Sequence, residues 1–378
     1  MDKPKIWLSS PHMGGNELLY INEAFETNWI APVGNNIAVF EKDLENYLDD
    51  AHVAVLNSGS AALHLGLLLL GVQKDDEVLV QSHTHIASVN PVIYLGATPI
   101  FIDSEVDTWN ICPKILEEAI QDRIKKGKKP KVIIAVELYG MPYKADEIRA
   151  IADKYEILIL EDSAEALGST YKNKKCGTLG DISILSFNGN KIITTSGGGA
   201  IVTKTKEAKE KTIFLSTQAR EVAPHYQHNE IGYNYRMSNI AAGIGRGQME
   251  VLEERIVQRR QIHQLYQDYF KYIEGVTVFS EPNEDFFSNH WLTAILIDAK
   301  IVGKSREDLR LALESENIES RPIWKPMHLQ PVFEYFEYYG SNVSETIFND
   351  GLCLPSGSNL SSDDKTRIIS VLDMFFKG

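Results

Sequence analysis

The alternation of short β-rich segments with helical segments between residues 53 and 203 constrains the fold most strongly. The predicted strands are residues 53–56, 77–80, 98–103, 131–136, 157–160, 182–185 and 200–203. Helical patterns lie between several of them, at residues 60–70, 86–95 and 113–126. The apolar residues of the strands are continuous rather than alternating, which is typical of strands buried on both faces. The pattern predicts an α/β domain with a mostly parallel sheet.

The residues beyond about 240 follow a different pattern and predict a second, smaller unit. A long helical region without proline spans residues 237–272. After it come a predicted strand, a helix, a strand-like stretch and a closing helix, at residues 291–297, 305–316, 318–323 and 361–376. A chain of 378 residues is also long for one core. We therefore expect a large domain over residues 1–240 and a small α+β domain over residues 241–378.

The charge balance and the cysteines argue against several classes of protein. The chain has 38 Lys and Arg against 52 Asp and Glu, a formal net charge of −14. This excess of acid disfavours nonspecific binding to nucleic acid or to anionic membranes. The three cysteines are unpatterned, so we expect neither a disulfide framework nor a zinc site. Without a signal peptide or a membrane-spanning apolar run, the chain is expected to be cytoplasmic.

Lys191 is the candidate for covalent chemistry. It follows the predicted strand at 182–185 and precedes small hydroxylated residues and three glycines at 197–199. An amine that forms a Schiff base needs backbone close by and little side-chain bulk around it. Taken alone, such a lysine is more often a surface residue before a glycine turn. The residues at other strand ends favour the chemical interpretation.

Two further strand ends carry residues that suit a phosphorylated, cationic ligand. Gly59 and Ser60 open a helix, where free N–H groups and the helix dipole attract a phosphate. Asp162 and Glu165 follow the strand at 157–160. A buried carboxylate needs a cationic partner, and a protonated pyridine nitrogen is one. Simple helix capping is the alternative in both places.

The segments at 82–88 and 232–239 add histidines, tyrosines and amides. His83 and His85 suggest a metal, but no third ligand has a convincing spacing, so no metal is expected. Stacking of one imidazole on a planar ligand is the better interpretation. The second segment precedes the long helix, and an N-cap at Ser238 is its plain alternative.

A phosphate seat, a strand-end aspartate and a downstream lysine are together the parts of a pyridoxal 5′-phosphate (PLP) site. With them the chain resembles the DegT/DnrJ-type sugar aminotransferases, from residues 11–17 to residues 354–357. The resemblance implies the fold-type I PLP-dependent transferase fold, with a mostly parallel sheet of the seven-stranded type. It implies Lys191 as the Schiff-base lysine, Asp162 as the partner of the pyridine nitrogen and His85 as the stacking ring.

The remaining cofactor contacts that the resemblance implies are Gly59, Ser60, Glu165, Ser186 and Asn234. Asn234 would reach the phosphate of the neighbouring subunit's cofactor, which implies a homodimer with shared active sites. Glu165 would lie near the cofactor phenolate, where a carboxylate is repulsive unless it is protonated or bridged.

Within the family, the chain most resembles the bacillosamine-pathway aminotransferases, in segments 28–32, 186–199, 216–221 and 319–328. This likeness implies amination of a UDP-linked 4-keto-6-deoxy-N-acetylhexosamine at C4, with glutamate as donor. Cationic residues can pair with diphosphate and tryptophan can cover a sugar or base. The candidate substrate contacts are Trp29, Arg220, Arg321, Trp324, Lys325 and His328.

Three alternatives remain open from the sequence. The substrate could be GDP-4-keto-6-deoxymannose, or a TDP-linked keto sugar. The chain could also be a noncatalytic nucleotide-sugar sensor. For the cationic residues near the C-terminus, a cluster of salt bridges between domains is the alternative to substrate binding.

Overall fold

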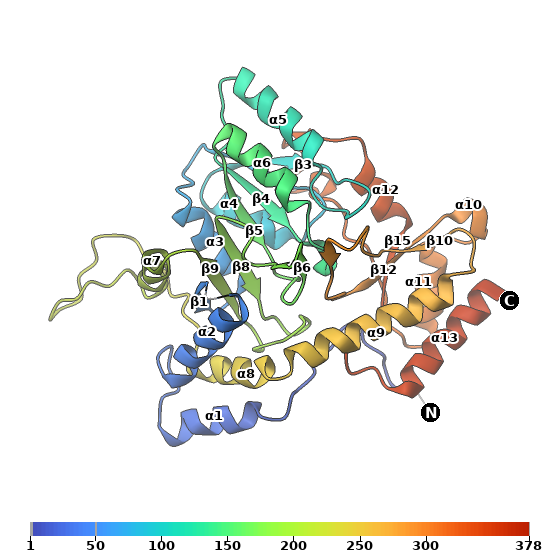
Figure 1. Cartoon of the computed structure of the whole chain (residues 1–378), viewed down its shortest axis with the longest axis horizontal. Helices are drawn as coiled ribbons and strands as arrows, with labels where there is room; N and C mark the ends of the chain where they lie inside the picture. The colour runs from blue at the N-terminus through green and yellow to red at the C-terminus, as the bar shows by residue number, and fades with distance from the viewer. Residues whose placement is uncertain (1–2, 50, 378) are drawn as a thin grey trace.

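The computed structural model describes residues 3–49 and 51–377 and is built around one large sheet (Figure 1). The sheet has eight strands in the order β1-β9-β8-β5-β4-β2-β3-β14. In that order they are β1 (His52–Leu56), β9 (Gly199–Thr203), β8 (Ile182–Ser186), β5 (Leu158–Asp162), β4 (Val132–Val136), β2 (Glu77–Gln81), β3 (Thr98–Ile102) and β14 (Tyr338–Tyr339). The seven strands predicted from the sequence are confirmed. The two-residue β14, which arrives from the C-terminal part, was not predicted.

The strands β3, β2, β4, β5 and β8 run parallel to one another, and only β9 opposes its neighbours β8 and β1. The mostly parallel sheet is therefore confirmed. Parallel strands place their carboxyl ends at one edge, where ligands bind in open α/β sheets. The residues that follow β2, β4, β5 and β8 consequently meet at that edge.

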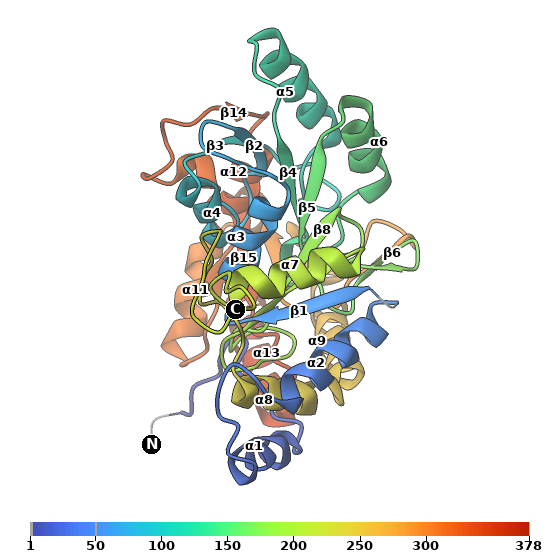
Figure 2. The ribbon, with the colours of Figure 1, turned by 90° about the vertical axis from the view of Figure 1, so that its left-hand side faces the viewer.

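Helices cover both faces of the sheet, as continuous apolar strands require. One face carries α5 and α6, and the other carries α3, α4 and α7. Beside the edge strand β1 lie α2 and α7 (Figure 2). The helices and 3₁₀ turns of this part are α1 (Glu17–Glu26), α2 (Asn35–Tyr47), α3 (Gly59–Leu69), η1 (Ile86–Ser88), α4 (Asn90–Tyr94), α5 (Pro113–Lys125), η2 (Leu138–Gly140), α6 (Ala145–Tyr155) and α7 (Lys206–Ser216).

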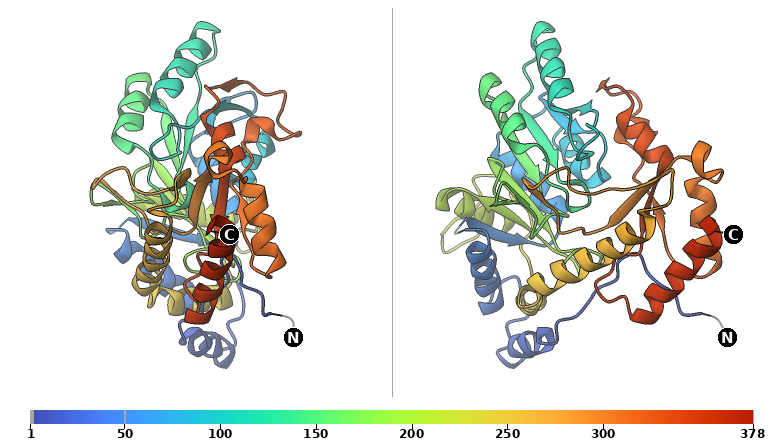
Figure 3. Two further views of the ribbon diagram at one scale, coloured as in Figure 1. Left: turned by 90° about the vertical axis from the view of Figure 1, so that its right-hand side faces the viewer. Right: turned by 45° about the vertical axis from the view of Figure 1, so that its right-hand side comes forward.

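The single long helix predicted over residues 237–272 is wrong, because two helices occupy it. They are α8 (Asn239–Met249) and α9 (Leu252–Phe270), and the backbone between them leaves helical geometry at Val251. The glycines of α8 let α1 and α2 approach closely. A Cβ added to Gly245 would lie 2.6 Å from the ring of Phe40. From α8, α9 runs across to the second sheet (Figure 3).

The second sheet has four strands in the order β10-β12-β15-β13. Its elements, with the helices and the minor strands of this part of the chain, are β10 (Val276–Val278), β11 (Phe286–Phe287), β12 (Thr293–Ile297), α10 (Ala299–Val302), α11 (Arg306–Ser315), β13 (Arg321–Pro322), η3 (Met327–Leu329), α12 (Val343–Asp350), β15 (Gly351–Leu354) and α13 (Ser362–Lys377). The strand predicted over residues 318–323 is reduced to β13, since Ile318 pairs instead with Ile6. A third sheet joins β11 to β6 (Thr170–Tyr171) and β7 (Lys174–Lys175).

The division of the chain at residue 240 stays a prediction. Two segments pack with the part of the chain on the other side of residue 240. Ile6 is buried with the apolar residues of α11 and α13, and β14 pairs with β3 at the edge of the large sheet. Among the residues that the structure describes, no helix is both long and apolar enough to cross a membrane.

Gly199, the first residue of β9, permits a close approach between the sheet and α3. A Cβ at this position would lie 2.5 Å from the backbone nitrogen of Gly59. We expect Gly199→Ala to lower the free energy of unfolding by about 2 kcal/mol, because the backbone must shift to relieve the overlap. Chemical denaturation measures this loss.

Gly197→Ala is the matched control, because a Cβ there would meet nothing within 4 Å. It should change the free energy of unfolding by less than about 0.5 kcal/mol. Equal losses in the two variants would contradict the close approach at α3.

Candidate active site

A cavity of about 340 Å³ opens at the carboxyl edge of the large sheet. The residues predicted from the sequence that line it are Gly59, Ser60, His85, Asp162, Glu165, Ser186, Lys191 and Trp324. They come from segments that are far apart in the chain. The parallel strands bring them together because each follows or faces a strand that ends at this edge.

The first turn of α3 forms one end of the cavity. Ser58 caps the helix, and its Oγ accepts a hydrogen bond from the backbone N–H of Ala61 at 3.1 Å. The cap proposed as the plain alternative is therefore present, and it leaves the other N–H groups of the turn without helical acceptors. A Cβ on Gly59 would lie 3.1 Å from the Cβ of Ser186, so the absent side chain leaves room between them. This arrangement suits an anion such as phosphate.

Asp162, the last residue of β5, lies on the floor of the cavity and is 4% exposed. One carboxylate oxygen accepts from Ser88 Oγ at 2.7 Å and the other from the backbone N–H of Ala164 at 3.2 Å. Burial raises the pKa of Asp162, while the bond from Ser88 and the charge of Lys191 oppose that shift. A cationic ligand atom beside Asp162 would favour its ionised form further.

Lys191 lies in the turn between β8 and β9, and its side chain is 12% exposed. Its Nζ is 3.3 Å from Glu165 Oε1 and 4.4 Å from the ring centroid of Trp291. The other oxygen of Glu165 accepts from the backbone N–H of Tyr139 at 2.7 Å. Burial raises the pKa of Glu165 to about 7, although the charge of Lys191 opposes the shift. The amine therefore faces the cavity beside a carboxyl group that titrates near neutral pH.

His85 and Trp324 form part of the cavity wall. Their ring centroids are 5.3 Å apart and their planes are inclined by 60°. The Nδ1 of His85 accepts from the backbone N–H of Ala87 at 3.2 Å. Burial lowers the pKa of His85, and the nearby charge of Lys191 adds to the effect. A neutral imidazole can lie against a cationic ring without charge repulsion.

Three predicted contacts lie away from this cavity within one chain. Trp29 is 54% exposed on the segment between α1 and α2. Arg220 and Asn234 are exposed on the connection between α7 and α8, which projects from the body of the chain in Figure 1. Arg220 packs on Tyr226, and Asn234 accepts a hydrogen bond from Gln218 at 3.0 Å.

Three other predicted substrate contacts are also outside the residues that line the cavity. Arg321 is exposed and its guanidinium is 2.7 Å from Glu319. Lys325 is partly buried, and its carbonyl accepts a hydrogen bond from Gln330 at 3.2 Å. The substrate-binding roles of Arg321 and Lys325 stay predictions.

His328 uses both ring nitrogens inside the fold. Nδ1 is 2.7 Å from Ser82 Oγ, Nε2 is 3.3 Å from Glu345, and the ring stacks on Tyr338 at 3.7 Å. A substrate would have to displace one of these partners. The contacts therefore favour a structural role for His328 over the predicted substrate contact.

Sequence reasoning missed two residues of the site. Ser88, which fixes Asp162, lies at the end of segment 82–88, and nothing in its spacing indicates that contact. Trp291 was assigned only to a strand, whereas β12 begins at Thr293 and Trp291 lines the cavity. Trp291 is about 100 residues from Lys191 in the chain, so only the folded structure joins them.

These groups fit PLP, which the sequence implies. The first turn of α3 offers N–H donors for a phosphate, Asp162 offers a buried carboxylate for a cationic ring nitrogen, and Lys191 offers an amine for an aldehyde. The cavity volume is also within the range of roughly 300–1,000 Å³ that small-molecule sites occupy.

Comparison with known proteins gives the same assignment. The DegT/DnrJ/EryC1/StrS aminotransferase family matches residues 11–373. EpsN of Bacillus subtilis, assigned as a pyridoxal phosphate-dependent aminotransferase, is 48% identical over 97% of this chain and 95% of EpsN. The GDP-perosamine synthase of Escherichia coli O157:H7 is 37% identical over 97% of each chain.

A solved structure supports the same aminotransferase assignment as these two relatives. The PLP form of Spr1654 of Streptococcus pneumoniae, assigned as a sugar aminotransferase, superposes with a TM-score of 0.89 at 26% identity. The match covers 100% of this chain and 99% of Spr1654. The fold-type I assignment and the PLP assignment are confirmed. This chain belongs to the DegT/DnrJ/EryC1/StrS aminotransferase family and is a PLP-dependent sugar aminotransferase.

Proposed function

We propose that this enzyme transfers an amino group from L-glutamate to C4 of a UDP-linked 4-keto-6-deoxy-N-acetylhexosamine. One observation carries the amino-transfer chemistry: Lys191, Asp162 and the first turn of α3 share one cavity. The UDP-linked substrate is supported by the likeness of segments 28–32 and 319–328 to the bacillosamine-pathway aminotransferases.

In this proposal Lys191 has two tasks. Its Nζ would hold the cofactor covalently, and as a free amine it would move a proton to and from the donor Cα. Bound PLP supplies an electron sink for the charge left on the donor carbon. Asp162 keeps the ring nitrogen protonated, and Ser88 holds the Asp162 carboxylate in place. Glu165 gives the freed amine a hydrogen-bond partner.

Substrate binding needs more positive charge than one chain offers. Among the described residues that line the cavity, Lys191 is the one lysine or arginine. A diphosphate is normally bound by several cationic groups. We therefore propose a homodimer in which the exposed Trp29, Arg220 and Asn234 of one subunit complete the site of the other. Trp324 would cover the sugar from within the chain, and Arg321 and Lys325 stay predicted substrate contacts. The cytoplasmic location stays a prediction.

GDP-4-keto-6-deoxymannose is the second candidate substrate. The 37% identity to the GDP-perosamine synthase of E. coli O157:H7 favours it. No residue of the site favours a TDP-linked sugar. A noncatalytic sensor does not fit, because the chain is a PLP-dependent sugar aminotransferase with the lysine, the aspartate and the phosphate seat in one cavity.

A panel of nucleotide sugars tests the substrate. With L-glutamate, the purified protein should aminate the UDP-linked 4-keto sugar with a kcat/KM at least about tenfold above that for the GDP- and TDP-linked sugars. Mass spectrometry of the products measures this. Preference for the GDP sugar would establish the second candidate, and no amination of any sugar would contradict the proposal.

Substituting the lysine tests the chemistry. Lys191→Ala should abolish the visible absorbance of lysine-bound cofactor and lower turnover by at least about a thousandfold, since one side chain supplies both the covalent attachment and the proton transfer. Absorbance and product formation are the measurements. Lys204→Ala, at a side chain that is 60% exposed, should keep both. Retained turnover in Lys191→Ala would refute its role.

The carboxyl group of Glu165 predicts a pH dependence of stability. Its pKa is raised to about 7, so the folded cofactor-free chain keeps a proton that the unfolded chain releases near its ordinary value. This stabilisation is complete below the unfolded pKa and is lost as the pH rises through about 7. Glu165→Gln lacks this dependence. The difference in free energy of unfolding between Glu165→Gln and wild type should therefore shift by roughly 3 kcal/mol in favour of the variant as the pH rises from about 4 to about 8.

Denaturant titrations of the cofactor-free proteins at several pH values measure this difference. Glu210→Gln, at a side chain that is 62% exposed, is the control and should gain less than about 0.5 kcal/mol. A difference between Glu165→Gln and wild type that is constant with pH would contradict the protonated carboxyl group.

A further inference from the structure

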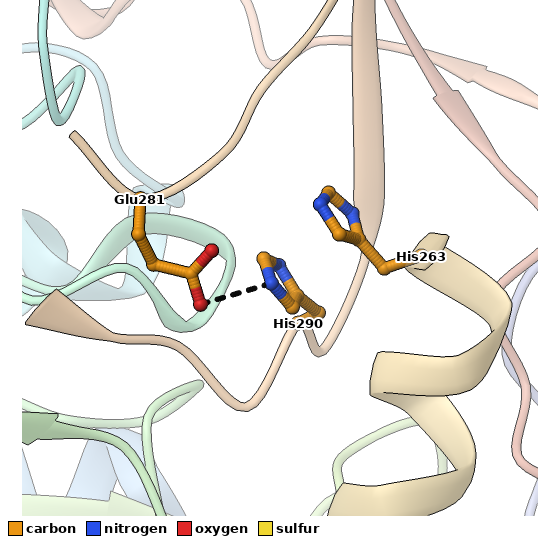
Figure 4. A group of neighbouring side chains, drawn as sticks. All are labelled: His263, Glu281 and His290. Atoms are coloured by element: carbon orange, nitrogen blue, oxygen red, sulfur yellow. Dashed lines mark ion pairs between the residues drawn. The ribbon is translucent and has the colours of Figure 1, made fainter. Parts of the chain in front are cut away.

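Three side chains with metal-ligand chemistry meet next to the segment that carries Trp291. They are His263, Glu281 and His290, with ligand atoms within 4.8 Å of one another (Figure 4). The two imidazoles are parallel to within 8°, with centroids 3.6 Å apart, so their in-plane lone pairs cannot converge on one ion. Arg260 Nη1 lies 2.6 Å from the Glu281 oxygen that also pairs with His290. The negative charge of Glu281 is thus already paired with Arg260. We interpret the cluster as one that stabilises the neighbouring backbone rather than one that binds a metal.

The supported segment is Ser288–Trp291, and the backbone N–H of each of its residues donates a hydrogen bond to a side chain. His290 has φ 47°, a left-handed conformation that is uncommon for residues other than glycine. The Asn289 side chain donates to the carbonyls of Glu165 and Leu167, at 2.8 and 2.9 Å, and accepts from the N–H of Trp291 at 2.8 Å. The fold therefore fixes Trp291 relative to Glu165.

The indole of Trp291 is in turn fixed to the turn that carries Lys191. Its ring N–H donates to the carbonyl of Asn190 at 2.6 Å, and Trp291 is 2% exposed. The face of the ring lies 4.4 Å from Lys191 Nζ, which Glu165 contacts at 3.3 Å. A lysine side chain has many rotamers of similar energy, and these two contacts restrict its amine to one part of the cavity. Both contacts persist in the neutral amine, which keeps N–H groups for the ring face and for the carboxyl group.

We propose that Trp291 is a positioning residue that holds the Lys191 amine ready for attachment to the cofactor. The proposal rests on the proposed function, in which Lys191 is the lysine that binds PLP. In the attachment step the neutral amine nitrogen forms a double bond to the aldehyde carbon, and the aldehyde oxygen leaves as water with the two amine hydrogens. Trp291 takes no part in the bond changes. It limits where the amine can lie before they occur.

Mixing the cofactor-free protein with PLP separates positioning from binding. The observed rate of the absorbance change, plotted against PLP concentration, gives a half-saturation for noncovalent binding and a limiting rate for the covalent step. The limiting rate is taken at a pH where it no longer rises, so that protonation of the amine does not contribute. A change in positioning should alter the limiting rate and leave the half-saturation constant, because substitutions at Trp291 do not change the phosphate seat or Asp162.

Trp291→Leu should lower the limiting rate about tenfold, on the scale of the rotamer freedom of one lysine side chain. Its half-saturation should stay within twofold of wild type, which corresponds to about 0.4 kcal/mol of binding free energy. Trp291→Phe keeps a ring face for the amine N–H groups and should recover the limiting rate to within about threefold of wild type. If circular dichroism shows that Trp291→Leu does not fold, Trp291→Met removes the ring with an unbranched side chain.

Trp109→Leu is the matched control, because it removes an equally buried indole, 4% exposed and stacked on Phe279, from outside the described residues that line the cavity. Its limiting rate should stay near that of wild type. An equal fall in Trp109→Leu, or an unchanged limiting rate in Trp291→Leu, would overturn the positioning role. Absence of the covalent absorbance in wild type would instead overturn the role proposed for Lys191, so the two failures are distinguishable.

Discussion

The burial of opposite charges at the carboxyl edge of the sheet is the constraint on which the rest of the site depends. Asp162 is 4% exposed and the side chain of Lys191 is 12% exposed, and both line one cavity. Removing a carboxylate from water is costly unless hydrogen bonds and a cation compensate. Ser88, Ala164 and the charge of Lys191 offset part of that cost, as the opposing influences on the pKa of Asp162 indicate. A protonated pyridine nitrogen would offset more, and this gives PLP a physical reason to bind here.

The order of the strands explains why these residues meet. β5 and β8 are parallel neighbours, so Asp162 and Ser186 end at the same edge. The chain then turns back into the antiparallel β9, and the turn carries Lys191 over that edge. Gly199 allows the start of α3 to lie against β9, which places the phosphate seat beside the amine. A few backbone contacts thus bring together segments that span more than 100 residues.

Local sequence signals predicted what depends on local chemistry. Continuous apolar runs identified the strands of the large sheet, and small or acidic residues at their ends identified Gly59, Asp162 and Lys191. The family resemblance added the fold type and the cofactor, which the comparisons support. The sequence did not predict features that depend on distant packing. The internal contacts of His328 and the approach of Trp291 to Lys191 each require a partner far along the chain.

The central claim is that the nitrogen of one residue holds the cofactor. Borohydride reduction of the PLP-loaded protein fixes the cofactor to whichever residue carries it, and peptide mass spectrometry then locates the added mass. We expect the reduced adduct on the peptide that contains Lys191, with Lys191 as the modified residue. An adduct on another lysine, with Lys191 unmodified, would contradict it.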